Sequence, residues 1–286
     1  MFDPGKRTDP EFNRRVFVGI GAGAAAIGGT IAGVLAQGEG FGQPHPPIVL
    51  ETDPAIHIER PEFLAGITAY AAVPKNATAS TPGVVIVQHI WGVDATIRDV
   101  VRRFAKEGFV AIAPDLFSRM HAPIGDAQSD YSIFVPYAEK LNDHQNALDL
   151  EAAAAWVRKR AGVAADHRPP KVGITGFCMG GSIALQQTWK NPKPFDAAAI
   201  WYGNVKDQNA AAITIPIEGN YGARDNGIPA TAVQEFAAKL KVPHDIKVYD
   251  EAGHAFFDDT RPSYVASAAA DAWARTLAFF RKYLKA

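Results

Sequence analysis

The sequence contains a single cysteine, Cys178, among 286 residues. One thiol excludes an internal disulfide framework and any zinc site built from several cysteines. An excess of charge is also missing, because 29 Lys and Arg residues face 30 Asp and Glu residues, which leaves a formal net charge of −1. A balanced charge gives no electrostatic reason to expect a nucleic acid or an acidic partner. We therefore expect no nucleic-acid partner.

Hydrophobic residues, in contrast, make up 48% of the chain, which is enough for a sizeable core. The length fits one large α/β domain or two small ones. No internal repeat of solenoid length is present, and nothing between residues 50 and 286 looks like an interdomain linker. We therefore expect one domain over residues 56–286, preceded by a linker over residues 37–55 with a Pro-rich spacer at 43–47.

The first 36 residues predict an export signal. Arg14 and Arg15 precede an uncharged run over residues 16–36 that is rich in Gly and Ala. This stretch resembles a twin-arginine secretion signal of bacteria, and its moderate hydrophobicity suits export better than the alternative of a permanent anchor. Small residues up to Ala36 fit cleavage by signal peptidase. We expect a periplasmic or secreted protein that meets the export machinery and signal peptidase, and that touches a membrane only if the signal is not cleaved.

Apolar runs alternate with helical patterns, which indicates a mostly parallel sheet with helices on both faces. Residues 115–139 have mixed composition with two prolines and a glycine, and so long an irregular segment predicts a lid or binding loop. The predicted strands cover residues 56–59 and 66–73 as a hairpin, then 83–88, 109–113, 172–175, 196–202, 213–219 and 245–249. The predicted helices cover residues 97–106, 142–160, 182–187, 229–240 and 264–284, the last with an apolar stripe that should dock on the sheet.

Residues 176–181 read Gly-Phe-Cys-Met-Gly-Gly and lie between a predicted strand and a predicted helix. This is a Gly-x-Cys-x-Gly form of the nucleophile elbow, with Cys178 in the place of the serine. Gly176 and Gly180 would let neighbouring backbone approach closely. The helix dipole behind the turn would favour a thiolate. The alternative is a buried structural cysteine, since free Cys is among the most buried residue types.

A cysteine nucleophile needs a base, and the base needs a group that orients it. In α/β-hydrolases these residues follow the nucleophile in the order acid, then histidine. His244 precedes a predicted strand, whereas His254 follows it at the carboxyl end, where a loop can reach Cys178. Asp225 follows another strand at the same edge, whereas Asp258 is too near His254 in sequence. We therefore predict a Cys178, His254 and Asp225 triad.

Two backbone N–H groups should stabilise the oxyanion of an acyl-transfer reaction. One belongs to Met179, directly after the nucleophile, and the candidate for the other is Ile90, in the loop after the strand at 83–88. The remaining histidines have no partners at metal-ligand spacing, so no metal is predicted. These are His57, His121, His144 and His167.

Three motifs in order, Gly-Phe-Cys-Met-Gly-Gly, Gly-x-x-Asp and Ala-Gly-His-Ala-Phe, resemble the dienelactone hydrolase family, also called carboxymethylenebutenolidases. Residues 84–94 and 109–117 are similar to that family's early strands, and the likeness extends over about residues 60–284. The resemblance implies an α/β-hydrolase fold, the triad of Cys178, Asp225 and His254, and hydrolysis of an ester or lactone through an acyl-enzyme without a cofactor.

The chain departs from the family's pattern at two positions. His89 replaces a glutamate thought to help activate the cysteine, and it could donate a hydrogen bond, act as a second base or pack beside Trp91. Asp258 replaces an arginine that binds the dienelactone carboxylate, and a carboxylate there would repel an anionic substrate. We therefore predict a neutral or cationic small-molecule ester or lactone rather than dienelactone. The candidate substrate-binding or auxiliary residues are His89, Trp91, Arg98, Arg119, Tyr202 and Asp258, and Arg224 is a further candidate for a substituted anion site.

Two alternatives stay open from the sequence. The same triad would serve an acyltransferase or a hydrolase of thioesters or amides, because it does not distinguish the acceptor. A non-catalytic scaffold that binds a ligand or senses oxidants through Cys178 is the alternative from another class, although the chain offers no resolving cysteine.

Overall fold

The computed structural model describes residues 42–63, 66–161 and 169–285. The predicted export signal and the predicted cleavage after Ala36 lie outside these residues. Within the described part of the chain, no helix combines the length and the apolar character needed to cross a membrane.

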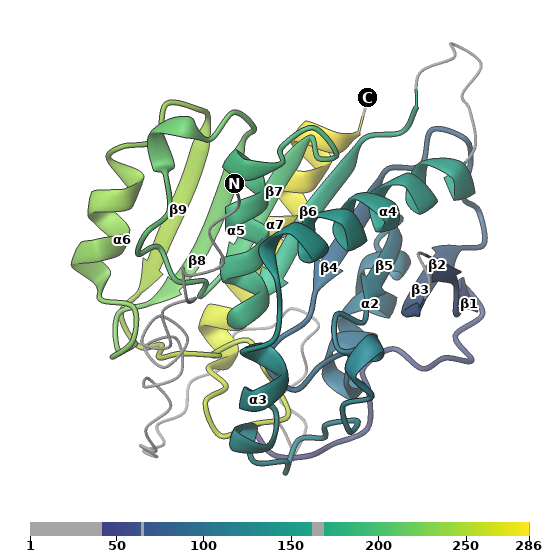
Figure 1. Cartoon of the computed structure of the whole chain (residues 1–286), viewed down its shortest axis with the longest axis horizontal. Helices are drawn as coiled ribbons and strands as arrows, with labels where there is room; N and C mark the ends of the chain where they lie inside the picture. The colour runs from purple at the N-terminus through teal and green to yellow at the C-terminus, as the bar shows by residue number, and fades with distance from the viewer. Residues whose placement is uncertain (1–41, 64–65, 162–168, 286) are drawn as a thin grey trace, which may run out of the picture.

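Strands and helices alternate along the described chain (Figure 1). The strands are β1 (Ile56–Glu59), β2 (Glu62–Phe63), β3 (Ile67–Pro74), β4 (Gly83–Val87), β5 (Val110–Pro114), β6 (Val172–Phe177), β7 (Ala197–Trp201), β8 (Ile217–Gly222) and β9 (His244–Tyr249). The α-helices are α2 (Ala95–Lys106), α3 (Val135–Ala138), α4 (Asp143–Ala161), α5 (Met179–Lys190), α6 (Ala230–Ala237) and α7 (Ala266–Leu284). Three short 3-10 turns are η1 (Ser118–Met120), η2 (Tyr131–Ile133) and η3 (Ala210–Ala212).

The strands of the described residues form one sheet in the order β1-β3-β5-β4-β6-β7-β8-β9, with β2 beside β3. From β5 to β9 all neighbours are parallel, whereas β3 is antiparallel to both β1 and β5. Every residue of β4, β5, β6 and β7 is buried, as expected for parallel strands covered on both faces. The mostly parallel sheet and the hairpin between β1 and β3 confirm the sequence prediction.

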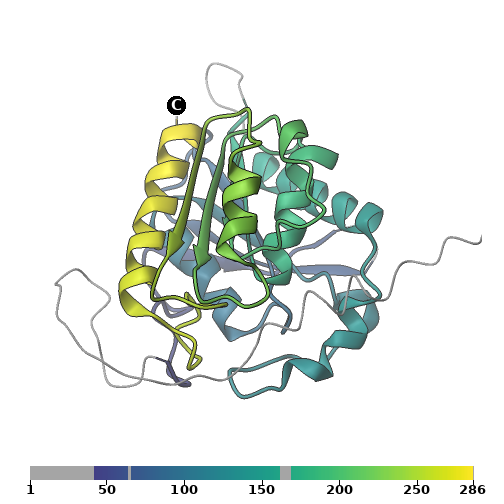
Figure 2. The same cartoon turned by 90° about the vertical axis from the view of Figure 1, so that its left-hand side faces the viewer.

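Helices cover both faces of the sheet, as predicted. Helices α2 and α7 pack in one hydrophobic core and α4, α5 and α6 in the other, and Figure 2 shows α7 and α6 on opposite sides of the strands. The predicted stripe on α7 is part of the core, because Ala269, Leu277, Phe280 and Leu284 are buried.

Strand β8 differs from the prediction of a strand over residues 213–219. It begins at Ile217 because Pro216 has no N–H to donate to the ladder, while Ile213 closes η3 by donating its N–H to the carbonyl of Ala210 at 3.3 Å. The strand instead continues to Gly222, so its carboxyl end lies just before Asp225.

The described part of the predicted linker is docked on the domain. The backbone N–H groups of Ile48 and Val49 donate to the carboxylate of Asp99 on α2 at 3.1 and 2.8 Å, and Arg102 donates to the carbonyl of Val49. The N–H of Gly42 donates to the carbonyl of Asp259 at 2.7 Å. Residues 42–51 therefore form an arm that joins α2 to the segment after β9.

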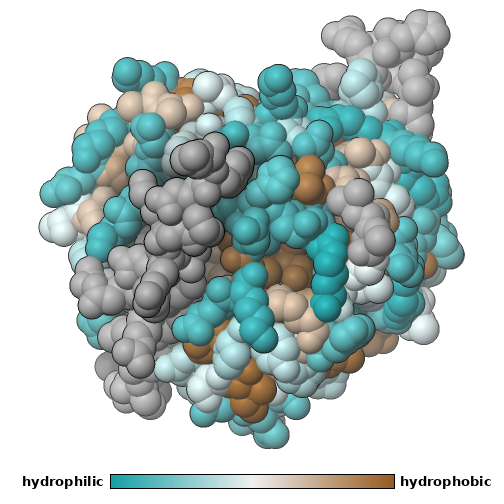
Figure 3. Space-filling view, viewed as in Figure 1, coloured by the Kyte–Doolittle hydropathy of each residue, from teal (hydrophilic) through white to brown (hydrophobic). Residues whose placement is uncertain are grey.

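The segment predicted as a lid or binding loop contains η1, η2 and α3. Two of its hydrophobic side chains are exposed, Ile124 (76%) and Ile133 (51%). Helix α3 and the segment after β9 lie below the sheet in Figure 1, and Figure 3 shows hydrophobic side chains among hydrophilic ones in that part of the surface.

Candidate active site

Cys178 lies at a strained turn between β6 and α5. Its φ of 57° and ψ of −118° fall in a region that non-glycine residues rarely adopt, and its N–H donates to the carbonyl of Trp201 at 3.1 Å. A Cβ on Gly180 would lie 2.3 Å from the carbonyl oxygen of Gln88, and one on Gly176 would lie 2.1 Å from the carbonyl oxygen of Gly180. The two glycines therefore permit the close packing that was predicted for a nucleophile elbow.

His254 and Asp225 meet although they follow different strands. His254 Nδ1 lies 2.6 Å from Asp225 Oδ2, while Asp225 Oδ1 accepts the N–H groups of Gly227 and Ile228 at 2.8 and 3.1 Å. Because its second oxygen is held by its own loop, this carboxylate is fixed in position. The loops after β8 and β9 are also joined to each other, since the N–H of Arg224 donates to the carbonyl of Ala252 at 2.9 Å.

The thiol and the imidazole change each other's pKa. Burial by itself would raise the pKa of the Cys178 thiol, but the charge and hydrogen bond of His254 outweigh burial and lower this pKa. Burial would likewise lower the pKa of His254, but the thiolate and the hydrogen bond to Asp225 raise it to about 10. The combination favours a thiolate–imidazolium ion pair at neutral pH.

Of the two predicted oxyanion donors, Met179 lies at the elbow as the first residue of α5. The backbone N–H of Met179 hydrogen-bonds to the Cys178 sulfur and helps to lower the thiol pKa, so it points at the reacting atom. The fully buried side chain of Ile90 belongs to the same core cluster as Cys178 and Met179. The contact between Gly180 and the end of β4 brings the start of the Ile90 loop against α5.

His89 lies buried among charged groups. Its Nε2 is 3.0 Å from Asp94 Oδ2 and its Nδ1 is 3.9 Å from Asp258 Oδ2. Burial by itself lowers the pKa of His89, but Asp94 and Asp258 outweigh burial and raise it. The positive charge of His89 in turn helps to lower the pKa of the Cys178 thiol.

Asp258 and Trp91 are both linked to an arginine that the sequence analysis did not single out. Arg261 Nε lies 3.2 Å from Asp258 Oδ2, and its guanidinium carbon lies 3.4 Å from the centre of the Trp91 ring. The Trp91 ring also packs edge-on against His89, with centroids 5.0 Å apart. Asp258 is therefore paired, and burial raises the pKa of its carboxyl group.

Of the other candidates, Tyr202 lies beside the triad and the arginines are engaged elsewhere. The Tyr202 ring lies 5.2 Å from the His254 ring, and burial raises the pKa of its hydroxyl well above the usual value. Arg119 donates to both oxygens of Asp149 on α4 at 2.8 and 2.9 Å. The guanidinium of Arg98 lies 5.7 Å from the centre of the Tyr70 ring, and exposed Arg224 donates to the carbonyl of Asp250 at 3.1 Å.

Three residues of the site were missed from the sequence: Asp94, Arg261 and Gly222. Asp94 was identifiable as a helix cap, because it precedes the first residue of α2 and its Oδ1 accepts the N–H of Ile97 at 3.0 Å. A Cβ on Gly222 would lie 2.4 Å from the carbonyl oxygen of Ala252, so this glycine lets the loop of His254 approach β8. Arg261 carries no local signal, since its partners depend on the tertiary fold.

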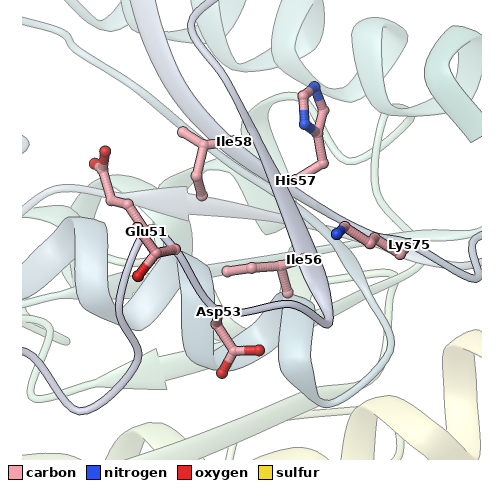
Figure 4. A pocket seen from close by; sticks show the side chains of 7 residues that line it. Glu51, Asp53, Ile56, His57, Ile58 and Lys75 are labelled. Atoms are coloured by element: carbon pink, nitrogen blue, oxygen red, sulfur yellow. The ribbon is translucent and has the colours of Figure 1, made fainter.

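A surface groove of about 450 Å³ lies beside β1, and its lining residues are Glu51, Thr52, Asp53, Ile56, His57, Ile58 and Lys75 (Figure 4). None of the predicted site residues belongs to this lining. In residues 42–63, 66–161 and 169–285, no group of His, Cys, Asp and Glu side chains is arranged to hold a metal ion.

Comparison with known proteins gives matches over the same region. The model of the dienelactone hydrolase family matches residues 67–284. Relatives named "Putative carboxymethylenebutenolidase" occur in Escherichia coli (strain K12), with 38% identity over 229 residues (75% of this chain and 82% of that protein), and in Yersinia pestis, with 37% over 235 residues (76% and 84%).

Solved structures of related proteins support the same family and show its fold. The Klebsiella pneumoniae structure titled "Putative Dienelactone Hydrolase" has 36% identity and a TM-score of 0.68, over 80% of this chain and 100% of that chain. A dienelactone hydrolase-like promiscuous phosphotriesterase from metagenomic libraries shares the fold, with 23% identity and a TM-score of 0.65 over 80% and 99% of the two chains. The fold is thus the predicted α/β-hydrolase fold, and the chain belongs to the dienelactone hydrolase family of ester and lactone hydrolases.

Proposed function

We propose that this chain hydrolyses small esters or lactones through Cys178, with His254 as the base and Asp225 as the group that orients it. The observation that carries the proposal is the arrangement around the sulfur. The charge of His254 and its interaction with the buried Cys178 thiol lower the pKa of that thiol, and the His254 imidazole lies 2.6 Å from a fixed carboxylate.

In this mechanism His254 takes the thiol proton and holds the thiolate as an ion pair. The thiolate attacks the substrate carbonyl, and the N–H groups of Met179 and Ile90 stabilise the oxyanion, each such donor being worth about 2.7–4 kcal/mol of the barrier. Loss of the alcohol leaves an acyl group on Cys178, and water then releases the acid. Asp225 keeps the imidazole in one tautomer and one orientation.

We propose neutral or cationic substrates rather than anionic ones. Two carboxylates, Asp94 and Asp258, lie within 3.9 Å of His89, whose charge in turn acts on Cys178. Asp258 Oδ2 forms an ion pair with Arg261 Nε at 3.2 Å, so this guanidinium is not free to bind an anionic substituent. The proposed substrate is therefore an ester or lactone without a carboxylate next to the scissile bond.

The test uses the full chain with p-nitrophenyl acetate. We expect release of p-nitrophenol together with an acetyl adduct on Cys178 in intact-mass spectra, and Cys178→Ala should lose both while keeping its circular dichroism and melting temperature. Turnover that survives in folded Cys178→Ala would overturn the proposal. An acetyl adduct that forms and is never hydrolysed would point to acyl transfer instead.

We also propose that residues 1–36 direct export to the periplasm or the medium. The support is the Arg14-Arg15 pair before an uncharged run. The full chain is expressed in a bacterium that has twin-arginine export. The protein found outside the cytoplasm should then have the mass of residues 37–286. Replacing both arginines with Lys should retain the uncut chain in the cytoplasm, and a wild-type chain that stays there would contradict the proposal.

A further inference from the structure

Two histidine–carboxylate pairs act on the single thiol. The first is His254 with Asp225, at 2.6 Å. The second is His89 with Asp94, at 3.0 Å, and both side chains of this pair are at most 5% exposed. Both imidazoles lower the pKa of the Cys178 thiol. The triad accounts for the first pair and leaves the second without a role.

The topology places the two pairs on different sides of the nucleophile. In the sheet, β4 lies next to β6 on one side, and β7, β8 and β9 follow on the other. His89 comes from the loop after β4 and His254 from the loop after β9. A substrate carbonyl bound at Cys178 would therefore have one imidazole toward each side.

His89 has one ring nitrogen to offer a reactant. Nε2 faces Asp94 at 3.0 Å, whereas Nδ1 is 3.9 Å from Asp258 Oδ2, which is beyond hydrogen-bond distance. Within the described residues neither nitrogen meets the geometry of a hydrogen bond, but Nε2 is fully enclosed against Asp94 as an ion pair, which leaves Nδ1 as the nitrogen that can meet a reactant. Asp94 is itself fixed, because its other oxygen accepts the N–H of Ile97 at the start of α2.

The two imidazoles differ in what holds their protons. His254 is bonded to Asp225 through Nδ1 and interacts with the sulfur through its other side, so its proton stabilises the thiolate. The charges that face His89 are Asp94, Asp258, Arg261 and the Cys178 sulfur. The two carboxylates outweigh burial, raise the pKa of His89 and so favour its cationic form. A buried cation with a free donor can give its proton to a substrate atom.

We propose that His89, held by Asp94, is a second proton-transfer residue that serves the leaving group and the hydrolytic water. This inference rests on the proposed function of Cys178. In acylation a bond forms between the sulfur and the carbonyl carbon, the bond from that carbon to the leaving oxygen breaks, and the leaving oxygen takes the His89 proton. His89 is then neutral, and His254 remains protonated.

Deacylation restores the proton. Neutral His89 takes a proton from water as the water oxygen bonds to the acyl carbon, and the carbon–sulfur bond breaks. The electron pair of that bond returns to sulfur, which is again a thiolate beside the His254 cation. The products are the alcohol and the carboxylic acid, and His89 is cationic as at the start.

The experiment separates acylation from deacylation by stopped-flow with p-nitrophenyl acetate. Its leaving group is a weak base whose bond breaks without proton transfer, so acylation does not need His89. In the wild type, His89 then gives its proton to the solvent, and neutral His89 is again available for deacylation. We expect His89→Gln to give a burst of one p-nitrophenol per active site, followed by a steady rate about 10²-fold below that of the wild type, with the acetyl-enzyme accumulating in intact-mass spectra. With ethyl acetate, which leaves as a strongly basic alkoxide, the burst of ethanol should be lost too.

The controls distinguish this role from others. His244→Gln, an exposed histidine at the opposite end of the sheet, should match the wild type. Asp94→Asn keeps an N-cap acceptor for α2. It removes a charge that raises the pKa of His89, so the pH at which the deacylation rate reaches half its maximum should move to a lower value. A purely structural role would lower burst and steady rate in the same proportion.

Two results would overturn the proposal. One is a steady rate in His89→Gln equal to that of the wild type with both esters. The other is a burst that falls as much as the steady rate in a variant that stays folded. Failure of the proposed function gives a different signature, because Cys178→Ala would then still turn over and the wild type would show neither burst nor adduct.

Discussion

His254 Nδ1 lies 2.6 Å from Asp225 Oδ2, and 29 positions of sequence separate the two residues. The contact exists because β8 and β9 are parallel neighbours whose loops leave the sheet at the same edge. Its effect reaches the sulfur, since the hydrogen bond to Asp225 raises the pKa of the imidazole that holds the Cys178 thiolate.

The thiol should therefore ionise below the range of an ordinary cysteine. The pKa of Cys178 is lowered. The rate of alkylation by iodoacetamide should therefore increase with pH along a limb whose midpoint lies below about 8.5, the usual cysteine pKa. In Asp225→Asn the imidazolium loses its carboxylate, so the thiolate loses stabilisation and this limb should move to higher pH. Exposed Asp207 offers a matched control, and Asp207→Asn should leave the limb unchanged. An identical limb in wild type and Asp225→Asn would contradict the coupling.

Gly180→Ala should damage the elbow. The new Cβ would lie 2.3 Å and 2.4 Å from the carbonyl oxygens of Gln88 and Val87, and because these are backbone atoms, the loop that carries Ile90 must shift. Overpacking of this kind costs about 1–3 kcal/mol, which urea unfolding would measure together with a loss of ester hydrolysis. Gly253→Ala is the control, because its Cβ would meet only Arg224 O at an ordinary 3.7 Å. Equal stability of the two variants would show that the close approach is unimportant.

Much of this site follows from local sequence. The strand, the Gly-x-Cys-x-Gly turn and the order of Asp225 and His254 predict the triad, because each residue comes after a parallel strand and parallel strands end at one edge. The start of β8 was misplaced because Pro216 interrupts an apolar run that looks like one strand. The pairing of Arg261 with Asp258 and with the Trp91 ring depends on the fold of the loop after β9, and no sequence pattern encodes it.

Asp258→Asn should relax the preference against anionic esters. The amide oxygen can still accept from the Thr260 hydroxyl, which lies 2.7 Å from Asp258 Oδ1, while the loss of charge releases Arg261. We expect kcat/KM for a monoester of succinic acid to rise about tenfold relative to a neutral ester, about 1.4 kcal/mol of transition-state energy. Because burial raises the pKa of Asp258, the wild type should approach the variant as pH falls.

The control for this change is an aspartate in the same loop that lies in solvent. Asp250 is exposed, so Asp250→Asn removes the same charge from the protein without removing it from the site. Its ratio of kcat/KM for the anionic and neutral esters should equal that of the wild type. If Asp250→Asn changes the ratio as much as Asp258→Asn does, the effect belongs to net charge and the proposed role of Asp258 is wrong.

One buried carboxyl group far from the catalytic chemistry should lower the stability of the fold as pH rises. Glu218 on β8 is fully buried; burial raises its pKa to about 8 despite the nearby Arg275. Between the ordinary value of 4.5 and about 8, the folded chain holds this proton and the unfolded chain releases it. The contribution of this group to the free energy of unfolding should therefore be greatest below pH 4.5 and be lost up to pH 8, by an amount on the order of 5 kcal/mol.

Urea unfolding at a series of pH values tests this decline. In Glu218→Gln the side chain has no proton to release, so the variant's free energy of unfolding should change less between pH 5 and 8 than that of the wild type. The Thr276 hydroxyl donates to Glu218 at 2.8 Å, and any effect of the amide on this bond adds the same energy at every pH. Glu235→Gln, at an exposed position of α6, is the matched control and should keep the wild-type slope. Parallel curves for the wild type and Glu218→Gln would mean that Glu218 is already ionised in the folded chain at pH 5, with Arg275, at 3.4 Å, compensating for its burial.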